Sequence, residues 1–419
     1  PMTWDMKKIV HLFSQRKEKV SDRDFPPLSV TKNGILLQLD NAAKTDDGDN
    51  RKRVCVGDFV INSRSDRKGS CGVSTLEGSV SLINIVLQPR QQLTGNYAHY
   101  LLRSQPFSEE FYRNGRGIVA DLWTTRYSEM KTILLPVPPR EEQDQIVRYL
   151  DWQVSKINRL IAAKRKEIDA IHDMEHLYID HVFSEIANQK TIRLKYLVEQ
   201  FVDCPHETPE YCKDGDYCVI RTADQDYGCL RSETLMYRLT ESEYTNRIRR
   251  APLNAGDIVY GREGERWGLA CVIPESEKFC LGQRIMQFVC NKQMVTPEYV
   301  MWALNSSYVR NQGILDTMGS TSPHVNISTI INFRIPYTSR EHQDTLVSKI
   351  ECTMQKYRQL CERIENEIQL LHDLRIRLIS DVVTGQIDVR GIKVPDDEYI
   401  NNEITEEEFE EESENNEEE

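Results

Sequence analysis

Two loops of the sequence combine arginine with serine or glycine, residue types that suit contact with DNA. Residues 63–70 read SRSDRKGS, and residues 261–268 read GREGERWG. Arginine offers a planar fork of donors that matches guanine edges or phosphate oxygens, while serine and glycine let a backbone approach closely. The alternative, a solvent-exposed turn with no ligand, stays open for each loop. The candidate DNA-binding residues are Lys32, Asn33, Arg64, Arg67, Lys68, Ser70, Arg221, Thr222, Arg262, Arg266, Trp267, Ser320 and Thr321.

Signatures of catalysis are missing from the sequence. It has no G-x-x-x-x-G-K-[ST] phosphate loop, no G-x-G-x-x-G after a strand and no H-E-x-x-H. An adenine methyltransferase would need an Asn/Asp-Pro-Pro-aromatic motif, and residues 24–27, DFPP, have the wrong order. We therefore expect no catalytic residue, no cofactor held by this chain and no metal. One candidate metal cluster lacks the tight cysteine pairs of structural zinc and is better explained by reduced, separate thiols; its members are Cys204, His206, Cys212, Cys218 and Cys229.

Most of the negative charge lies in one terminal segment. The chain of 419 residues has a formal net charge of −13, and residues 396–419 contain 14 acidic side chains and no basic one. The rest therefore carries a net charge of +1. We expect residues 392–419 to form a disordered acidic tail, either a solubilising extension or an internal competitor of a polyanion. No run of 18 apolar residues and no leader-like segment occurs, so a cytoplasmic protein without a membrane partner is expected.

The elements that must position these loops are repeated once along the chain. When the sequence is shifted by 200 residues, PVPPREEQDQIV at 136–147 aligns with PYTSREHQDTLV at 336–347. Gly57-Asp58 matches Gly256-Asp257 at a shift of 199, and Tyr97 matches Tyr299 at a shift of 202. The Gly-Asp pairs are typical of turns that precede a strand. The chain is therefore predicted to consist of two half-length copies in tandem.

Each copy ends in a long helix. Matched apolar residues step by three or four, no proline interrupts the pattern, and the helices are predicted near residues 140–186 and 340–384, with Gly385 ending the second. Because the same stripe recurs in the same register, we expect the helices to pair, and connectivity makes that pairing antiparallel. Two ordinary helices packed on separate cores are the alternative. The predicted coiled-coil residues are Leu150, Ile157, Ile161, Ile168, Ile350, Tyr357, Ile364 and Leu371.

The parts before the helices are predicted to be two mixed heads. Short β-branched runs lie between turn signals, with a helix near residues 96–113 and its counterpart near residues 297–312. The predicted fold class is α+β, with one twisted, partly antiparallel sheet in each head and a pseudo-twofold arrangement about the helices. The predicted domains are a first head at 1–139, a first spacer helix at 140–187, a second head at 188–339, a second spacer helix at 340–391, and the tail at 392–419.

This pattern closely resembles the DNA-specificity subunit of type I restriction–modification enzymes over essentially residues 1–391. The resemblance is carried by LLPVPPREEQDQIVRYLD and FRIPYTSREHQDTLVSKI at the helix starts, and by LRIRLISDVVTGQIDVRG at the end of the second copy. FPPLSVTKNGI, VDCPHETPEY and GSTSPHVNIS are also typical of the family. The first head departs from the pattern, because it has GRGIVADLW where the second has GSTSPHVN, and the acidic tail lies outside it.

The resemblance implies a function for each part of the chain and for its partner subunits. Each head would be a target-recognition domain for one half of a split, asymmetric DNA site, and the helices would fix the gap between the halves. Two methyltransferase subunits, which bind S-adenosylmethionine and flip the target adenine, would dock on this chain, and restriction–translocase subunits would join them. Two alternatives stay open: a specificity subunit whose partner fuses methyltransferase and nuclease, and a scaffold that binds proteins instead of DNA.

Overall fold

The structure, a computed structural model, describes residues 4–38, 48–117, 123–205, 207–274, 278–318 and 323–395. It divides into two compact units. The first unit contains residues up to 165 together with those from 365 onward, and the second contains residues 166–364. Ser320, Thr321 and the acidic segment from residue 396 lie outside the described residues. No helix of the described part is long and apolar enough to cross a membrane.

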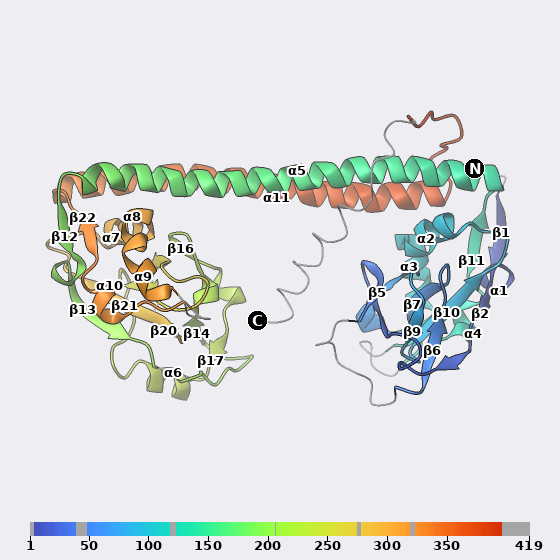
Figure 1. The fold of residues 1–419 in the computed structure, drawn as a ribbon, viewed down its shortest axis with the longest axis horizontal. Coiled ribbons are helices and arrows are strands. Elements are labelled where there is room, and N and C mark those ends of the chain that lie inside the picture. Colours follow the sequence, from blue (N-terminus) through green and yellow to red (C-terminus); the bar gives the residue numbers. More distant parts are fainter. Residues whose placement is uncertain are drawn as a thin grey trace. The chain divides into compact units, whose positions relative to one another are not determined.

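Two long helices contribute to both units. Helix α5 spans Arg140–Ala187 and helix α11 spans Arg340–Val383, each within one residue of the predicted bounds. In the first unit, Leu150 near the start of α5 shares a core with Val382 at the end of α11. In the second unit, Phe183 near the end of α5 shares a core with Ile350 near the start of α11. The two helices are therefore antiparallel within each unit, as predicted (Figure 1).

The predicted seam between the helices is mostly buried. Five of its eight residues are buried, and Ile168, Tyr357 and Leu371 are half-buried. The matched pair Met174 and Leu374 continues the apolar repeat, yet these side chains are 44% and 51% exposed. The apolar repeat is thus wider than the seam that the two helices bury.

A glycine ends the second long helix, as predicted. Gly385 has a φ of +76°, a conformation that glycine adopts without a Cβ penalty. The Gly385 N–H donates to the carbonyl of Val382, and the Gln386 N–H donates to that of Asp381. These two bonds form a Schellman motif, which satisfies carbonyls that the helix end would leave unbonded.

Each unit contains an antiparallel four-stranded sheet of the same order. The first consists of β2 (Phe13–Gln15), β10 (Asn84–Pro89), β7 (Phe59–Asn62) and β8 (Cys71–Val73). The second consists of β13 (Val198–Asp203), β21 (Ile285–Cys290), β18 (Ile258–Gly261) and β19 (Ala270–Val272). The α+β class is confirmed for both units, and the shared strand order confirms the duplication.

The prediction of one sheet per head is wrong, because small sheets flank the four-stranded one in each unit. In the second unit, one of these contains a parallel pair, β14 with β20.

The further elements of the first unit are β1 (Asp5–Lys8), α1 (Ile9–Leu12), β3 (Lys19–Val20), β4 (Leu28–Thr31), β5 (Gly34–Leu37), β6 (Arg51–Val54), the 3₁₀ turn η1 (Ser65–Arg67), β9 (Gly78–Val80), α4 (Tyr127–Met130) and β11 (Leu134–Val137). Those of the second are β12 (Thr191–Arg193), η3 (Leu194–Tyr196), β14 (Tyr217–Ile220), η4 (Thr222–Asp224), β15 (Gln225–Asp226), β16 (Cys229–Leu230), η5 (Glu233–Leu235), β17 (Arg238–Leu239), α6 (Glu241–Arg247), β20 (Phe279–Leu281), η6 (Asn311–Gly313), α9 (Ile314–Thr317), α10 (Ile327–Ile330) and β22 (Arg334–Pro336).

The head helices are shorter than predicted. The segment near 96–113 forms α2 (Gly95–Arg103) and α3 (Gln105–Arg113), and that near 297–312 begins with α7 (Pro297–Asn305) and α8 (Ser307–Arg310). A serine with extended backbone, Ser104 or Ser306, breaks each helix at the same place in the repeat. The serine hydroxyl donates to the carbonyl three residues earlier and so competes with the helical bonding pattern.

Matched polar contacts join each head to its helix. The Tyr97 hydroxyl donates to the Pro136 carbonyl at 3.3 Å, and that of Tyr299 donates to the Pro336 carbonyl at 3.0 Å. The buried Gln143 side chain accepts a bond from the Thr94 N–H at 2.9 Å. Its counterpart in the second unit is Gln343, which accepts from the Thr296 N–H at 3.1 Å. The duplicated residues therefore keep the head–helix junction, which explains why they are the same in both copies.

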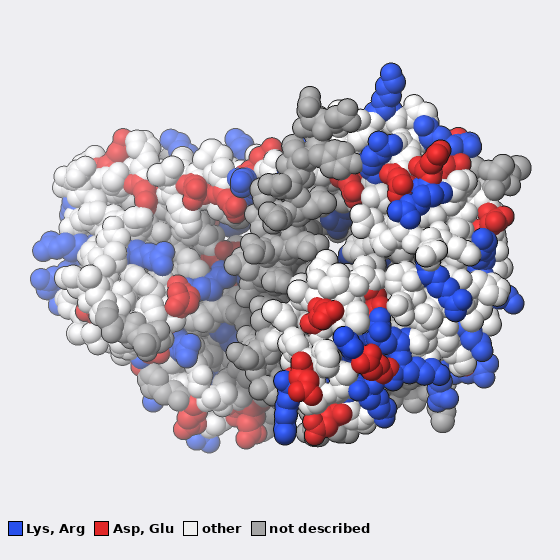
Figure 2. Space-filling model, turned by 45° about the vertical axis from the view of Figure 1, so that its right-hand side comes forward, with Lys and Arg blue, Asp and Glu red and all other residues white. Residues whose placement is uncertain are grey.

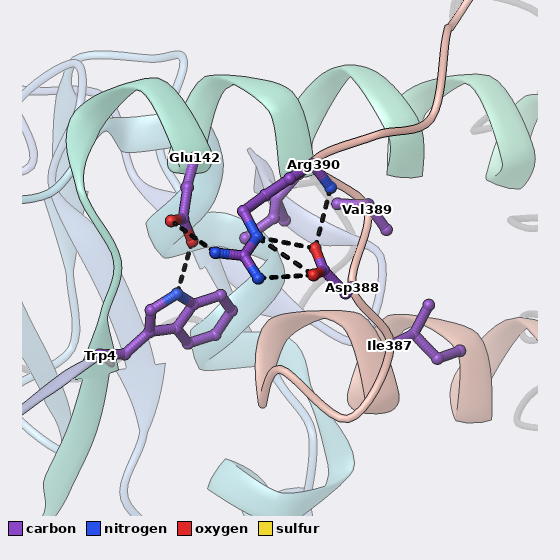
Figure 3. A pocket seen from close by; sticks show the side chains of 7 residues that line it. Trp4, Glu142, Ile387, Asp388, Val389 and Arg390 are labelled. Atoms are coloured by element: carbon purple, nitrogen blue, oxygen red, sulfur yellow. Dashed lines mark hydrogen bonds and ion pairs between the residues drawn. The ribbon is translucent and has the colours of Figure 1, made fainter. Parts of the chain in front are cut away.

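The chain after α11 returns to the start of α5 within the first unit. Val389 is buried in the core of this unit, and the Gln145 side chain donates to the Val389 carbonyl at 3.0 Å. Figure 3 shows Trp4 and Arg390 turned toward Glu142, with the Trp4 indole N–H donating to that carboxylate at 2.6 Å. The two distant ends of the described chain thus contact the same helical turn.

Candidate nucleic-acid interface

The arginine-rich loop of the first head is anchored by its backbone. The Ser65 N–H donates to the Trp123 carbonyl and the Thr125 N–H donates to the Ser63 carbonyl, both at 2.9 Å. The Tyr112 hydroxyl from α3 donates to the Arg67 carbonyl at 3.2 Å. Burial raises the pKa of Tyr112, which keeps its hydroxyl a neutral donor. Hydrogen bonds to its backbone therefore fix the loop, and its basic side chains are not used in this anchoring.

The basic side chains of this loop point to solvent. Arg64, Arg67 and Lys68 are exposed, and none of them makes an ion pair with another described residue. Ser70 is buried, and its N–H donates to the Arg67 carbonyl, so its part in the loop is structural. Figure 2 shows many Lys and Arg side chains over the face of the first unit that it brings forward, with acidic ones among them.

A second turn lies against this loop. Lys32, exposed, and Asn33, half-buried, form the turn between β4 and β5. A Cβ added at Gly69 would lie 4.0 Å from the Lys32 side chain, so the turn and the loop are neighbours. Arg103 of α2 donates to the Lys32 carbonyl at 2.5 Å and supports the turn. The structure thus brings together the predicted candidates of the first head.

The loop of the second head is anchored in the same way. The Val325 N–H donates to the Arg262 carbonyl at 3.0 Å, and the Gly264 N–H donates to the Pro323 carbonyl at 2.9 Å. These residues lie 199 or 200 positions after their counterparts in the first head. Gly264 and Gly268 have φ values of +85° and +89°, which a side chain would strain. The two heads therefore share one loop scaffold but carry different side chains on it.

Two candidates of the second head are part of its interior. Arg262 is 5% exposed, and its guanidinium lies 3.3 Å from Asp203 and 2.9 Å from Glu263. Trp267 is buried in the main core of this unit, with the Arg310 guanidinium 4.9 Å from its ring centre. Both residues stabilise the loop rather than present a free donor.

Arg266 is the more accessible arginine of this loop. Its side chain is 36% exposed, donates to the Gln225 carbonyl at 2.7 Å and lies 3.6 Å from Asp226. Arg221 is held more firmly, because its guanidinium donates to both carboxylate oxygens of Asp224 and lies 3.9 Å from the Tyr237 ring centre. Thr222 is half-buried beside it.

The loop scaffold also presents residues that the sequence pattern did not single out. His324, which is partly exposed, lies 3.2 Å from the Glu263 carboxylate and pairs with Glu263 in a short β-bridge. Arg284 is exposed and has a φ of +66°, a strained conformation for a residue with a Cβ. Its carbonyl accepts the Arg262 N–H at 3.0 Å. The sequence repeat could have indicated these two residues if it had been applied to the segments that face each loop as well as to the loops themselves.

Further basic residues of the first head make contacts within the head itself. Three consecutive basic residues, Arg51, Lys52 and Arg53, lie on strand β6. Arg51 is buried against Ser79, and the Lys52 ammonium donates to two backbone carbonyls. Among the described residues, no group of three or more His, Cys, Asp or Glu side chains could hold a metal ion.

Each unit thus combines a mixed α/β head with antiparallel stretches of α5 and α11, and the two heads carry unlike side chains on the same loop scaffold. A solved structure described as "Structural basis underlying complex assembly and conformational transition of the type I R-M system" has the same fold, with a TM-score of 0.62 and 13% identity over 92% of this chain and 99% of its own. The "HsdS subunit from Thermoanaerobacter tengcongensis" matches 92% of this chain and 98% of its own, with 14% identity and a TM-score of 0.46. No family model matches the chain.

One protein is also similar to this chain in its sequence. The "Type I restriction enzyme MjaVIII specificity subunit" of Methanocaldococcus jannaschii is 21% identical over 282 residues, which are 62% of this chain and 64% of that protein. The match thus spans somewhat less than two thirds of the relative. The resemblance to type I specificity subunits is confirmed by this similarity and by the shared fold.

Proposed function

We propose that this chain is the sequence-specific DNA-binding subunit of a type I restriction–modification complex. Each head, residues 1–139 and residues 188–339, recognises one half of a split DNA site, and the helices at 140–187 and 340–391 set the distance between the halves. The observation that carries the proposal is the shared loop scaffold: the anchoring bonds at Ser63 and Ser65 recur at Arg262 and Gly264, while the side chains differ. A common frame with unlike side chains suits recognition of two different half-sites.

The chain itself makes and breaks no bond in this proposal. Two methyltransferase subunits bring S-adenosylmethionine and accept the flipped adenine, and restriction–translocase subunits join the complex. The duplicated helix surface supports two partner sites. Met174 and Leu177 leave an exposed apolar patch on α5 in the second unit, and Leu374 and Leu370 leave one on α11 in the first. Exposed apolar patches of this kind mark protein interfaces.

Methylome sequencing tests the proposal. Cells carrying this chain and its methyltransferase should acquire N6-methyladenine within one split motif, and deleting the chain should abolish that methylation. In a gel-shift titration, binding to a duplex with the motif should survive competitor DNA and weaken steeply as salt rises. Binding that competitor DNA removes completely would contradict the proposal.

Partner docking is tested by co-purification. Met174→Lys and Leu374→Lys together should release the methyltransferase subunits, because charge is costly in an apolar interface. Each single substitution should release about one of the two subunits. Exposed Gln369 of α11 provides a control, since Gln369→Lys adds the same charge about 140° around the helix from Leu374.

A further inference from the structure

Arg284 of the second head has a backbone conformation that disfavours a side chain. Its φ is +66°, and among the described residues it is the only non-glycine residue with a positive φ. This left-handed region brings a Cβ close to the following carbonyl oxygen, so glycine normally occupies it. Arginine also lacks the short polar side chain by which asparagine or aspartate can bond locally in this conformation. An arginine at this position therefore lowers folding stability.

Contacts on both sides of Arg284 impose this conformation. Residues 282–284 join β20, in a small sheet, to β21 in the four-stranded sheet. The Gly282 N–H donates to the Ile220 carbonyl at 2.8 Å, and a Cβ added at Gly282 would lie 2.5 Å from that oxygen. The Arg284 carbonyl accepts the Arg262 N–H at 3.0 Å. Because this three-residue link is short and held at both ends, the strain persists in the folded chain.

The guanidinium of Arg284 is not used in folding contacts within the described part of the chain. The side chain is exposed, and its guanidinium makes no hydrogen bond or ion pair with a described residue. Two neighbouring arginines differ, since Arg262 lies 2.9 Å from Glu263 and Arg266 lies 3.6 Å from Asp226. The donors of Arg284 are therefore available to a ligand.

This guanidinium lies beside the loop of residues 261–268. A Cβ added at Gly264 would be 3.6 Å from Arg284 Nη1, so the glycine leaves room for the arginine next to the loop backbone. The Gly264 N–H donates to the Pro323 carbonyl at 2.9 Å, which fixes this part of the loop. Arg284 thus lies at the surface by which the second head is proposed to contact DNA.

The first head has an apolar residue at the same place in the scaffold. The strand pairing of the two four-stranded sheets aligns Arg284 with Ile83. The Ile83 carbonyl accepts the Ser63 hydroxyl at 2.6 Å, and the Arg284 carbonyl accepts a bond from Arg262, the counterpart of Ser63. Phosphates flank every half-site, so a phosphate contact should recur in both heads, whereas a base contact carries sequence and should differ. The change from isoleucine to arginine therefore favours a base contact.

We propose that Arg284 binds the edge of a guanine in the half-site that the second head recognises. The inference rests on the proposed function and names one base contact within it. An arginine can donate two parallel bonds to the O6 and N7 acceptors of guanine in the major groove. Such a contact requires a guanidinium in a fixed place, which the firmly held backbone at Arg284 supplies. The strained conformation is retained for binding and not for folding.

The test uses the full chain with the subunits that co-purify, and a duplex with the methylome-defined motif. Each guanine of the motif is replaced in turn by 7-deazaguanine, which lacks the N7 acceptor. One replacement should weaken binding by the native chain, and the same replacement should not weaken binding by R284Q further. R284Q should bind the unmodified motif about 10- to 100-fold more weakly, as expected for one lost bidentate contact. Its affinity for a random duplex should change little.

Further variants separate binding from folding. R284G removes the strain together with the guanidinium, so it should weaken motif binding as R284Q does and yet raise the thermal unfolding midpoint by about 2 °C. R284K keeps the charge without the planar fork and should lose most of the discrimination at the guanine. R334Q, at an exposed arginine of β22 in the same unit, is the control and should leave binding unchanged.

Three results would overturn the inference while motif binding by the native chain still supports the proposed function. The first is that no 7-deazaguanine position distinguishes the native chain from R284Q. The second is an equal loss by R284Q on the motif and the random duplex, which indicates a phosphate contact. The third is an unfolding midpoint of R284G at or below the native value, which indicates a structural role. A native chain that does not prefer the motif refutes the proposed function itself.

Discussion

Arg375 of α11 donates a hydrogen bond to the side-chain oxygen of Asn158 of α5 over 2.7 Å, although 217 residues separate them in the chain. Asn158 lies in the first half of its helix and Arg375 in the last quarter of the other. A second contact falls six residues later in α5 and eight residues earlier in α11, so the two helices run antiparallel. Lys164 of α5 and Glu367 of α11 add an ion pair of 2.9 Å between the same helices. Within the first unit, these two contacts therefore join helix α5 of the first copy to helix α11 of the second copy.

Arg266→Ala should impair recognition of one half-site. Arg266 is the accessible arginine of the second head's loop, and loss of a base contact should cost about 1–3 kcal/mol in specific binding. Methylome sequencing and DNA titration measure the effect. The other half-site should stay unchanged, and Arg193→Ala, an exposed arginine of β12, serves as the control. Equal loss at both half-sites would mean that Arg266 is structural.

Replacing Arg64, Arg67 and Lys68 by glutamine should affect the opposite half-site. These exposed cations make no ion pair within the described residues, so their removal costs little folding stability. If all three contact phosphates, the salt slope of binding should fall by about 3. Exposed Lys131 of the same unit lies outside the loop, and Lys131→Gln should leave the slope unchanged.

Lengthening both helices should lengthen the spacer of the DNA site. Seven residues inserted after Arg165 and seven after Ile364 add about 10 Å of helix and keep the apolar stripe in register. The gap between half-sites should grow by about three base pairs, since each pair occupies about 3.4 Å. The half-site sequences should not change. A five-residue insertion at both places is the control, because it rotates the stripe by about 140° and should abolish pairing.

Stability should fall in mild acid because of His99. Burial, and then the charge of Arg103, lower the pKa of His99 to about 4, while an unfolded histidine has a pKa of about 6.5. Between these values the unfolded state binds a proton that the folded state does not, so stability decreases as pH falls. From pH 7 to pH 5 the loss should be about 2 kcal/mol in urea unfolding. His99→Gln should remove this part of the pH dependence, and His181→Gln, on an exposed side chain of α5, should not.

Gly385→Ala should destabilise the end of α11. A left-handed conformation costs a residue with a Cβ about 1–2 kcal/mol, and Gly385 has a φ of +76°. Thermal unfolding followed by circular dichroism measures the change. Gly391→Ala is the matched control, since a Cβ there would meet no atom within 4 Å. Equal stability of both variants would contradict the role of the Schellman motif.

The sequence alone determined the duplication, the two long helices and their direction. The stripe of Leu150, Ile157 and Ile350 is a local periodic signal, and connectivity allows only one orientation for two such helices that pair. The turns at Gly57 and Gly256 and the helix end at Gly385 were also predictable, because backbone conformation at these points depends on the residue itself.

The tertiary structure decided which arginines face solvent. Arg64 and Arg262 lie in loops that look alike in sequence, yet the first is exposed and the second is 5% exposed. The difference arises from Asp203 and Glu263, which surround the second guanidinium. The contact of Arg375 with Asn158 was equally hidden, because it depends on packing between residues 217 positions apart in the chain. Segments distant in the sequence determine which side chains are buried and which charges lie next to one another. Helices and turns, in contrast, depend on residues that are close together in the sequence.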